Sequence, residues 1–91
     1  MKNTIVAYIQ IIPIGEENFC KAALEKIQVD IEQCGLPMKK QQFGYAIEGA
    51  YEPIMRICEA LQLAAFNAGV KQIDLTIRMH SASGQNLHLN S

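Results

Sequence analysis

The chain has 91 residues, of which 49% are hydrophobic and 19% are charged, and its formal net charge is -1 at pH 7. This length suits one domain with one core, and a domain this small gains stability from association because it buries a limited share of its surface. Nucleic acids and anionic membranes are bound through clustered Lys and Arg, which a near-neutral chain lacks. We therefore expect no nucleic-acid partner and no membrane partner.

The cysteines and the first apolar run both indicate a reducing compartment. Cys20, Cys34 and Cys58 form no C-x-x-C pair, and an odd number of cysteines fits free thiols better than a disulfide framework. The run at residues 5–14 is too short for a bilayer span and lacks the charged leader of a secretion signal. We therefore predict a cytoplasmic protein with no metal centre and no cofactor.

The first predicted element is a β-strand over Thr4–Ile12, because this run is rich in β-branched and aromatic residues. Successive side chains of a strand alternate between the two faces of a sheet. One face carries Ile5, Ala7, Ile9 and Ile11, expected in the core, and the other carries Val6, Tyr8, Gln10 and Ile12. Pro13 and Gly15 are expected to end the strand.

Two amphipathic helices are predicted from apolar residues spaced by four, three, four and three positions. In the first helix Asn18 is the expected N-cap and Gly35 the expected stop. Its apolar stripe is Cys20, Leu24, Ile27, Ile31 and Cys34. In the second helix Pro53 suits the first turn and Gly69 the end. Its apolar stripe is Ile54, Cys58, Leu61, Ala65 and Ala68.

Three further strands complete the pattern. Met38–Phe43 reads as a polar, exposed strand, joined by a tight hairpin to a strand over Gly44–Gly49. Gln72–His80 alternates apolar with polar residues and is predicted as the last strand. The residues after Ser81 are polar and weakly patterned, so we expect a mobile tail over 81–91 beyond a single domain at 1–80.

The order β-α-β-β-α-β predicts an α+β fold of the ferredoxin-like kind, a four-stranded antiparallel sheet with two helices on one face. The opposite face, called the bare face below, is left without helices. Alternation assigns to it Val6, Tyr8, Gln10, Ile12, Ala46, Glu48, Asp74, Thr76 and Arg78. This mixture is too apolar for plain solvent and too polar for a core, so we expect it to meet another subunit, a ligand or both.

Glu48 is the most informative single residue for function. It lies on the bare face, where an ionised carboxylate is tolerated only if it is wet, paired or liganded. For Glu48 and Arg78 the alternatives are an ion pair that bridges subunits and contact with a ligand. Tyr8 is the better contact candidate of two tyrosines, because Tyr45 points with Ile47 toward the helices.

No motif in the sequence indicates catalysis. An RNA-reading sheet needs exposed aromatics on both central strands, and this face offers Tyr8 alone, beside Glu48. An acyl-phosphate hydrolase on this plan needs an arginine after the first strand, where Glu16 and Glu17 stand. There is no zinc-type spacing and no nucleophile paired with a base. His80 and His88 read as solvated surface residues, and we predict that the protein is not an enzyme.

Several segments in order resemble the small thiamine-binding, YkoF-like family. They are Ile11-Ile12-Pro13-Ile14-Gly15, Phe43-Gly44-Tyr45-Ala46-Ile47-Glu48-Gly49, and Ala68-Gly69-Val70 ahead of a strand that bears Ile77-Arg78. The resemblance spans residues 4–80. It implies a ferredoxin-like domain that assembles through its sheets into dimers and tetramers. It also implies that some members bind thiamine or its hydroxymethylpyrimidine part, with no known catalysis.

The family pattern transfers to this chain only in part. The first turn of the pattern is matched by Pro13 and Gly15. Its central strand is matched by Gly44, Glu48 and Gly49. In the last strand, Arg78 takes the place of a usual basic residue. The chain departs from the pattern at three places. Tyr45 stands where a small threonine is common, and Glu16-Glu17-Asn18 stands where small hydroxyl residues are frequent. His80-Ser81-Ala82 replaces a basic end after the last strand.

The residues also support such a ligand on chemical grounds. An aminopyrimidine needs an aromatic or aliphatic wall and partners for its amine and ring nitrogens, and a thiazolium carries positive charge. Glu48 would accept from the amine or balance the cation, Gln10 would contact the ring edge and Tyr8 would stack. With Tyr45 and Arg78, these are the predicted ligand-binding residues of a homo-oligomer. The alternative is an assembly or regulatory module whose bare face serves self-association only.

Overall fold

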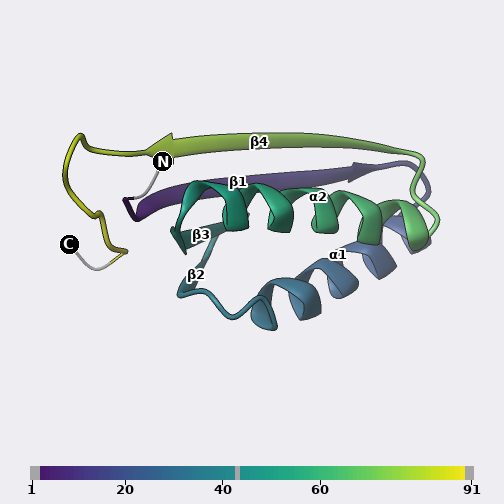
Figure 1. The fold of residues 1–91 in the computed structure, drawn as a ribbon. Coiled ribbons are helices and arrows are strands. Elements are labelled where there is room, and N and C mark those ends of the chain that lie inside the picture. Colours follow the sequence, from purple (N-terminus) through teal and green to yellow (C-terminus); the bar gives the residue numbers. More distant parts are fainter. Residues whose placement is uncertain (1–2, 43, 90–91) are drawn as a thin grey trace.

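The computed structural model describes residues 3–42 and 44–89, which form one sheet and two helices (Figure 1). The elements are β1 (Ile5–Ile14), α1 (Glu17–Glu32), β2 (Met38–Gln41), β3 (Gly44–Gly49), α2 (Tyr51–Asn67) and β4 (Gln72–His80). The strands lie in the order β2-β3-β1-β4, and every neighbouring pair is antiparallel. The predicted ferredoxin-like α+β fold is confirmed. Within the described ranges, neither helix has the length and apolar character needed to cross a bilayer.

The hydrophobic core lies between the sheet and the two helices, which cover the same face (Figure 1). β1 contributes the residues expected there, namely Ile5, Ala7, Ile9 and Ile11. The helices contribute Ala23, Ile27 and Ile31 from α1 and Ile54, Cys58, Leu61, Ala64 and Ala65 from α2. Tyr45 and Ile47 of β3 face the same core, as alternation predicted.

Helix α1 differs from its prediction at its start and in its buried stripe. It begins at Glu17, with Glu16 in extended conformation as the N-cap residue, so Asn18 lies inside the helix. Carboxylates at this end are favoured by the positive end of the helix dipole. The buried line runs at intervals of four residues from Ala23, which places Leu24 on the flank, where its side chain is 48% exposed.

Strand β1 runs beyond its predicted end at Ile12, through Pro13 to Ile14. It pairs with β3 only from Ile5 to Ile9, whereas it pairs with β4 as far as Ile14. The last part of β1 therefore has a neighbouring strand on its β4 side only, among the residues that the structure describes. Such an edge tolerates a proline, because one side of the strand needs no hydrogen-bond donor.

The hairpin of β2 and β3 approaches β1 closely at Gly44. β3 spans the predicted residues, whereas β2 ends at Gln41, and its predicted end at Phe43 lies outside the described residues. A Cβ atom at position 44 would collide with the carbonyl oxygen of Ile9. Glycine is thus required here for close packing of two backbones.

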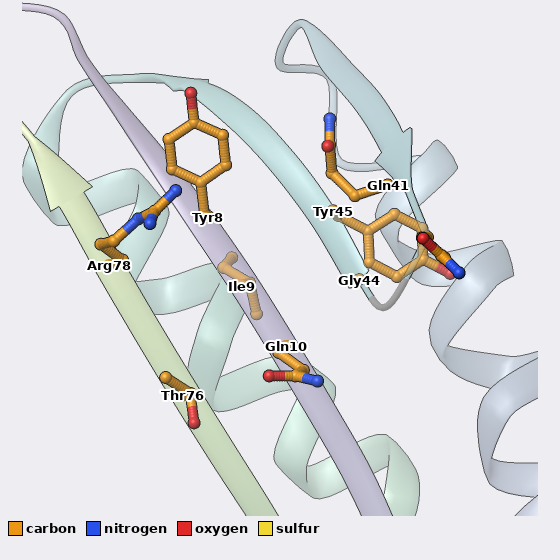
Figure 2. Close-up of a pocket in the computed structure, with 9 residues that line it drawn as sticks. Tyr8, Ile9, Gln10, Gln41, Gly44, Tyr45, Thr76 and Arg78 are labelled. Atoms are coloured by element: carbon orange, nitrogen blue, oxygen red, sulfur yellow. The ribbon is translucent and has the colours of Figure 1, made fainter.

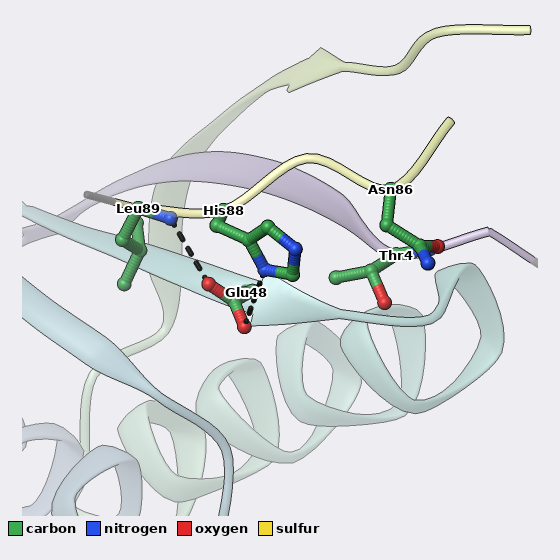
Figure 3. Close-up of polar contacts among 5 residues, drawn as sticks. All are labelled: Thr4, Glu48, Asn86, His88 and Leu89. Atoms are coloured by element: carbon green, nitrogen blue, oxygen red, sulfur yellow. Dashed lines mark hydrogen bonds and ion pairs between the residues drawn. The ribbon is translucent and has the colours of Figure 1, made fainter. Parts of the chain in front are cut away.

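The C-terminal segment, residues 81–89, does not extend away from the sheet as a mobile tail would. Its turn contains a bridge between Ala82 and Gln85. Beyond the turn, the Leu87 N–H donates to the Thr4 carbonyl at 2.9 Å, and the Thr4 N–H donates to Oδ1 of Asn86 at 2.7 Å. The segment therefore returns to the beginning of β1 (Figure 3).

The variant Gly44→Ala should lower the free energy of unfolding by about 1–3 kcal/mol, because the added methyl group must displace the β1 backbone. Urea denaturation measures this loss. The matched control is Gly49→Ala, whose Cβ would lie 2.9 Å from Cδ1 of Leu36, the end of a flexible side chain that can move. Equal losses for the two variants would contradict the close approach of β3 to β1.

Candidate functional site

The strand register arranges the bare face in rows that cross β3, β1 and β4. One row contains Glu48, Val6 and His80, and the next contains Ala46, Tyr8 and Arg78. Further along β1, Gln10 pairs with Thr76 and Ile12 pairs with Asp74. Glu48 and Arg78 thus lie in different rows on opposite sides of β1.

A cavity of about 370 Å³ opens beside the beginning of β3 (Figure 2). Gly44 of β3 lines this cavity beside Tyr8 and Gln10 and has no side chain to fill it. The volume lies in the range of small-molecule sites. The residues that line it are Tyr8, Ile9, Gln10, Gln41, Gln42, Gly44, Tyr45, Thr76 and Arg78.

The cavity brings together Tyr8, Gln10, Tyr45 and Arg78, four of the five residues predicted to bind a ligand. They come from β1, β3 and β4 and are separated in the sequence. The fifth, Glu48, does not line the cavity. In the close-up, Arg78 and Thr76 lie on the β4 side of Tyr8 and Gln10, and Gln41 and Tyr45 lie on the hairpin side (Figure 2).

Two side chains of β4 hold the Tyr8 ring. The guanidinium carbon of Arg78 lies 4.8 Å from the ring centroid, which is a cation–π distance. The His80 ring meets Tyr8 edge-on, with centroids 5.1 Å apart and an interplanar angle of 63°.

Arg78 has no carboxylate within ion-pair distance among the described residues. The ion pairs there are Lys26 with Asp30 and His88 with Glu48.

Tyr45 lies where this cavity meets a second one on the helix side of the sheet. The second cavity has a volume of about 510 Å³, and its lining includes Leu24, Ile27 and Lys40. Tyr45 is 9% exposed. Burial, with a smaller contribution from the negative charge of Glu32, raises the pKa of its phenol. The hydroxyl is therefore a neutral hydrogen-bond donor at physiological pH.

The Glu48 carboxylate is engaged by the C-terminal segment (Figure 3). The Leu89 N–H donates to Oε1 at 3.0 Å, and Nδ1 of His88 lies 3.3 Å from Oε2. These contacts, first that of Leu89 and then that of His88, lower the pKa of Glu48. His88 is exposed, as predicted for a surface histidine, and its ring also pairs with this carboxylate, which the sequence analysis did not predict.

The sequence analysis did not select Gln41, Gln42 and Thr76 as site residues. Alternation had already placed Thr76 on the bare face, so a signal for it was present. The two glutamines were assigned to an exposed polar strand, and only the three-dimensional position of the hairpin brings them to the cavity. Together the lining offers aromatic surface, carboxamides, hydroxyls and one guanidinium, which are groups that bind and orient a polar ring.

Metal binding has no support in the part of the chain that the structure describes. No group of three or more His, Cys, Asp or Glu side chains is placed to hold an ion there. Cys20, Cys34 and Cys58 are free thiols. Burial raises the pKa of the Cys58 thiol, which keeps it protonated and unreactive.

The fold and the cavity define a ferredoxin-like domain with a small-molecule-sized hollow on its uncovered sheet face. The sequence model of a family described as thiamine-binding protein matches residues 7–91. This chain belongs to the thiamine-binding protein family. The match includes the C-terminal segment as well as the sheet and helices.

Solved structures share the fold at low sequence identity. The DUF77 domain of unknown function from Bacillus cereus has a TM-score of 0.89 at 14% identity, over 97% of this chain and 85% of that chain. A candidate thiamine biosynthesis/salvage protein from Thermotoga maritima has a TM-score of 0.83 at 16% identity, over 96% and 91%. A hypothetical protein from Methanocaldococcus jannascii has a TM-score of 0.83 at 16% identity, over 97% and 90%. A comparison with curated proteins finds no significant match.

The variant Glu48→Gln should loosen the C-terminal segment, because a neutral carboxamide accepts a weaker hydrogen bond from Leu89 than a carboxylate does. We expect faster hydrogen exchange at the Leu87 and Leu89 amides and a lower free energy of unfolding. Glu59→Gln, at an exposed position on α2, is the control and should change neither.

The effect of Glu48→Gln should depend on pH in one direction. The lowered pKa of Glu48 means that its contribution to stability is present above the ordinary carboxyl pKa and is lost as the pH falls through the folded value. The difference between wild type and variant should therefore be present at pH 7 and vanish in acid. A difference that persists once Glu48 is protonated would contradict a charge-assisted contact.

Proposed function

We propose that this protein is a non-enzymatic binding protein for thiamine or a related hydroxymethylpyrimidine-like heteroaromatic ligand. The observation that carries the proposal is that Tyr8, Gln10, Tyr45 and Arg78 line one cavity in a member of the thiamine-binding protein family. The lining supplies groups for binding, and no cysteine, serine or histidine contributes to it within the described chain. We therefore propose that the protein binds its ligand without catalysing a reaction.

The cavity lining suits a substituted pyrimidine. The Tyr8 ring lines the cavity and offers a stacking surface there. The carboxamides of Gln10, Gln41 and Gln42 each offer both donors and acceptors for an exocyclic amine and ring nitrogens. Glu48 is not needed for this arrangement, because its carboxylate already bonds to the C-terminal segment.

We also propose that the protein acts as a homo-oligomer in the cytoplasm. Ile12 on the bare face is 46% exposed, and Ile73, Leu75, Ile77 and Met79 of β4 are only partly buried. Apolar surface of this kind supports contact with a second copy of the chain. Three free thiols fit a reducing compartment.

Calorimetric titration tests the binding proposal. Thiamine or hydroxymethylpyrimidine should bind to the wild type, and Tyr8→Ala should weaken binding by about tenfold to a hundredfold, because stacking on an aromatic ring contributes about 1–3 kcal/mol. The control is Tyr51→Ala, at an exposed tyrosine of α2. The absence of heat and of any thermal shift at millimolar concentrations of both ligands would reject this ligand class.

Light scattering on the same samples separates the proposal from its alternative. A binding protein that works as an oligomer should show both a mass above that of one chain and ligand heat. A mass above that of one chain without ligand heat would indicate a module that serves assembly only.

A further inference from the structure

We propose, on the basis of the proposed function, that this cavity selects heteroaromatic ligands that carry an anionic substituent, such as a phosphate monoester, over cationic ones. The inference starts from the charges that face the cavity. Among the described residues that line it, Arg78 is the one with a formal charge. The adjoining cavity on the helix side adds Lys40 and no carboxylate. A ligand in this region therefore meets positive charge from both sides of the sheet.

Neither cavity has a carboxylate among its described lining residues, although the negative charge of Glu32 acts on Tyr45 from α1. Glu48 lies in the row next to that of Tyr8, but its two oxygens accept from Leu89 and pair with His88. Asp74 lies in the row of Ile12, beyond Gln10, and does not line the cavity. A cationic ring would find no carboxylate in the lining.

A cation would also compete with Arg78 for the aromatic surface. The guanidinium already lies 4.8 Å from the centroid of the Tyr8 ring, so a thiazolium stacked on Tyr8 would share one aromatic ring with a second cation. Two positive groups at one ring repel each other. The same arrangement favours a neutral ring on Tyr8 with a negative group near Arg78.

The β4 side of the cavity supplies the groups that bind an anion. The planar guanidinium of Arg78 matches the geometry of a phosphate through paired N–H donors. Thr76 lies on the same face of β4 as Arg78, and its hydroxyl is a further donor in the lining. The neutral ring would then lie toward the hairpin, beside the carboxamide of Gln41 (Figure 2).

The test is a calorimetric comparison of four probes on the full chain: hydroxymethylpyrimidine, its phosphate monoester, thiamine and inorganic phosphate. The monoester should bind about ten- to hundredfold more tightly than the neutral compound, because hydrogen bonds to a charged group are stronger. Thiamine should bind most weakly of the three ring compounds. The advantage of the monoester should decrease as the salt concentration rises.

Variants at Arg78 assign the preference to one side chain. Arg78→Gln should remove the advantage of the monoester over neutral hydroxymethylpyrimidine, because a neutral carboxamide offers no charge-assisted hydrogen bond to the phosphate. Arg78→Lys should retain part of the advantage, since it keeps the charge but loses the paired donors. Arg56→Gln, at an exposed position on α2, is the control and should leave the preference unchanged.

The outcomes separate this inference from the proposed function. If no ring compound binds, the proposed function fails and this inference fails with it. If the neutral compound or thiamine binds at least as tightly as the monoester, or if the preference survives in Arg78→Gln, only the charge selection is overturned. Inorganic phosphate that binds as tightly as the monoester would also overturn it, because the ring would then add nothing.

Discussion

The unequal lengths of β1 and β3 are the constraint on which the rest of this structure depends. β3 follows β1 only as far as Ile9, whereas β4 follows it to Ile14. Among the described residues, the second half of β1 therefore has no partner strand on this side, and the hairpin of β2 and β3 borders the gap. Gly44 permits the two backbones to approach at this point, and it lines the hollow. The cavity is thus a consequence of sheet geometry and of one small residue.

The bare face has two parts with different environments. At one end, Val6 and Ala46 are 4% and 1% exposed, and Glu48 in the row of Val6 bonds to the C-terminal segment. At the other end, Tyr8, Gln10, Thr76 and Arg78 border an open cavity. The acid that the sequence suggested as counter-ion of a cationic ligand is therefore used within the chain. Among the described lining residues the formal charge at the cavity is that of Arg78, and our proposal of an anionic ligand rests on it.

Periodicity was sufficient to predict most of the fold. The alternation in Gly44–Gly49 and Gln72–His80 and the spacing in the second helix identified these elements, because burial on one face imposes a regular pattern on the sequence. It failed where something other than burial decides the structure. The first helix starts after Glu16 and not after Asn18, and β1 passes through Pro13 because one of its sides needs no partner there.

Only part of the candidate site could be predicted, because only some of its residues follow the alternation of a strand. Alternation placed Tyr8, Gln10 and Arg78 on one face, and the fold brings them to one cavity. The contacts of the C-terminal segment are hydrogen bonds between polar groups distant in sequence, such as Leu89 with Glu48, and these leave no periodic signal. The contribution of Gln41 depends on how far β3 extends along β1, which the residue pattern alone does not specify.

The most direct test of the central claim is a crystal structure of the protein with a hydroxymethylpyrimidine ligand at millimolar concentration. The account predicts density for the ring beside Tyr8, within reach of Gln10 and Arg78, with the hydrogen bond between Leu89 and Glu48 intact. A ligand bound instead to the Glu48 carboxylate, with the C-terminal segment displaced, would contradict it.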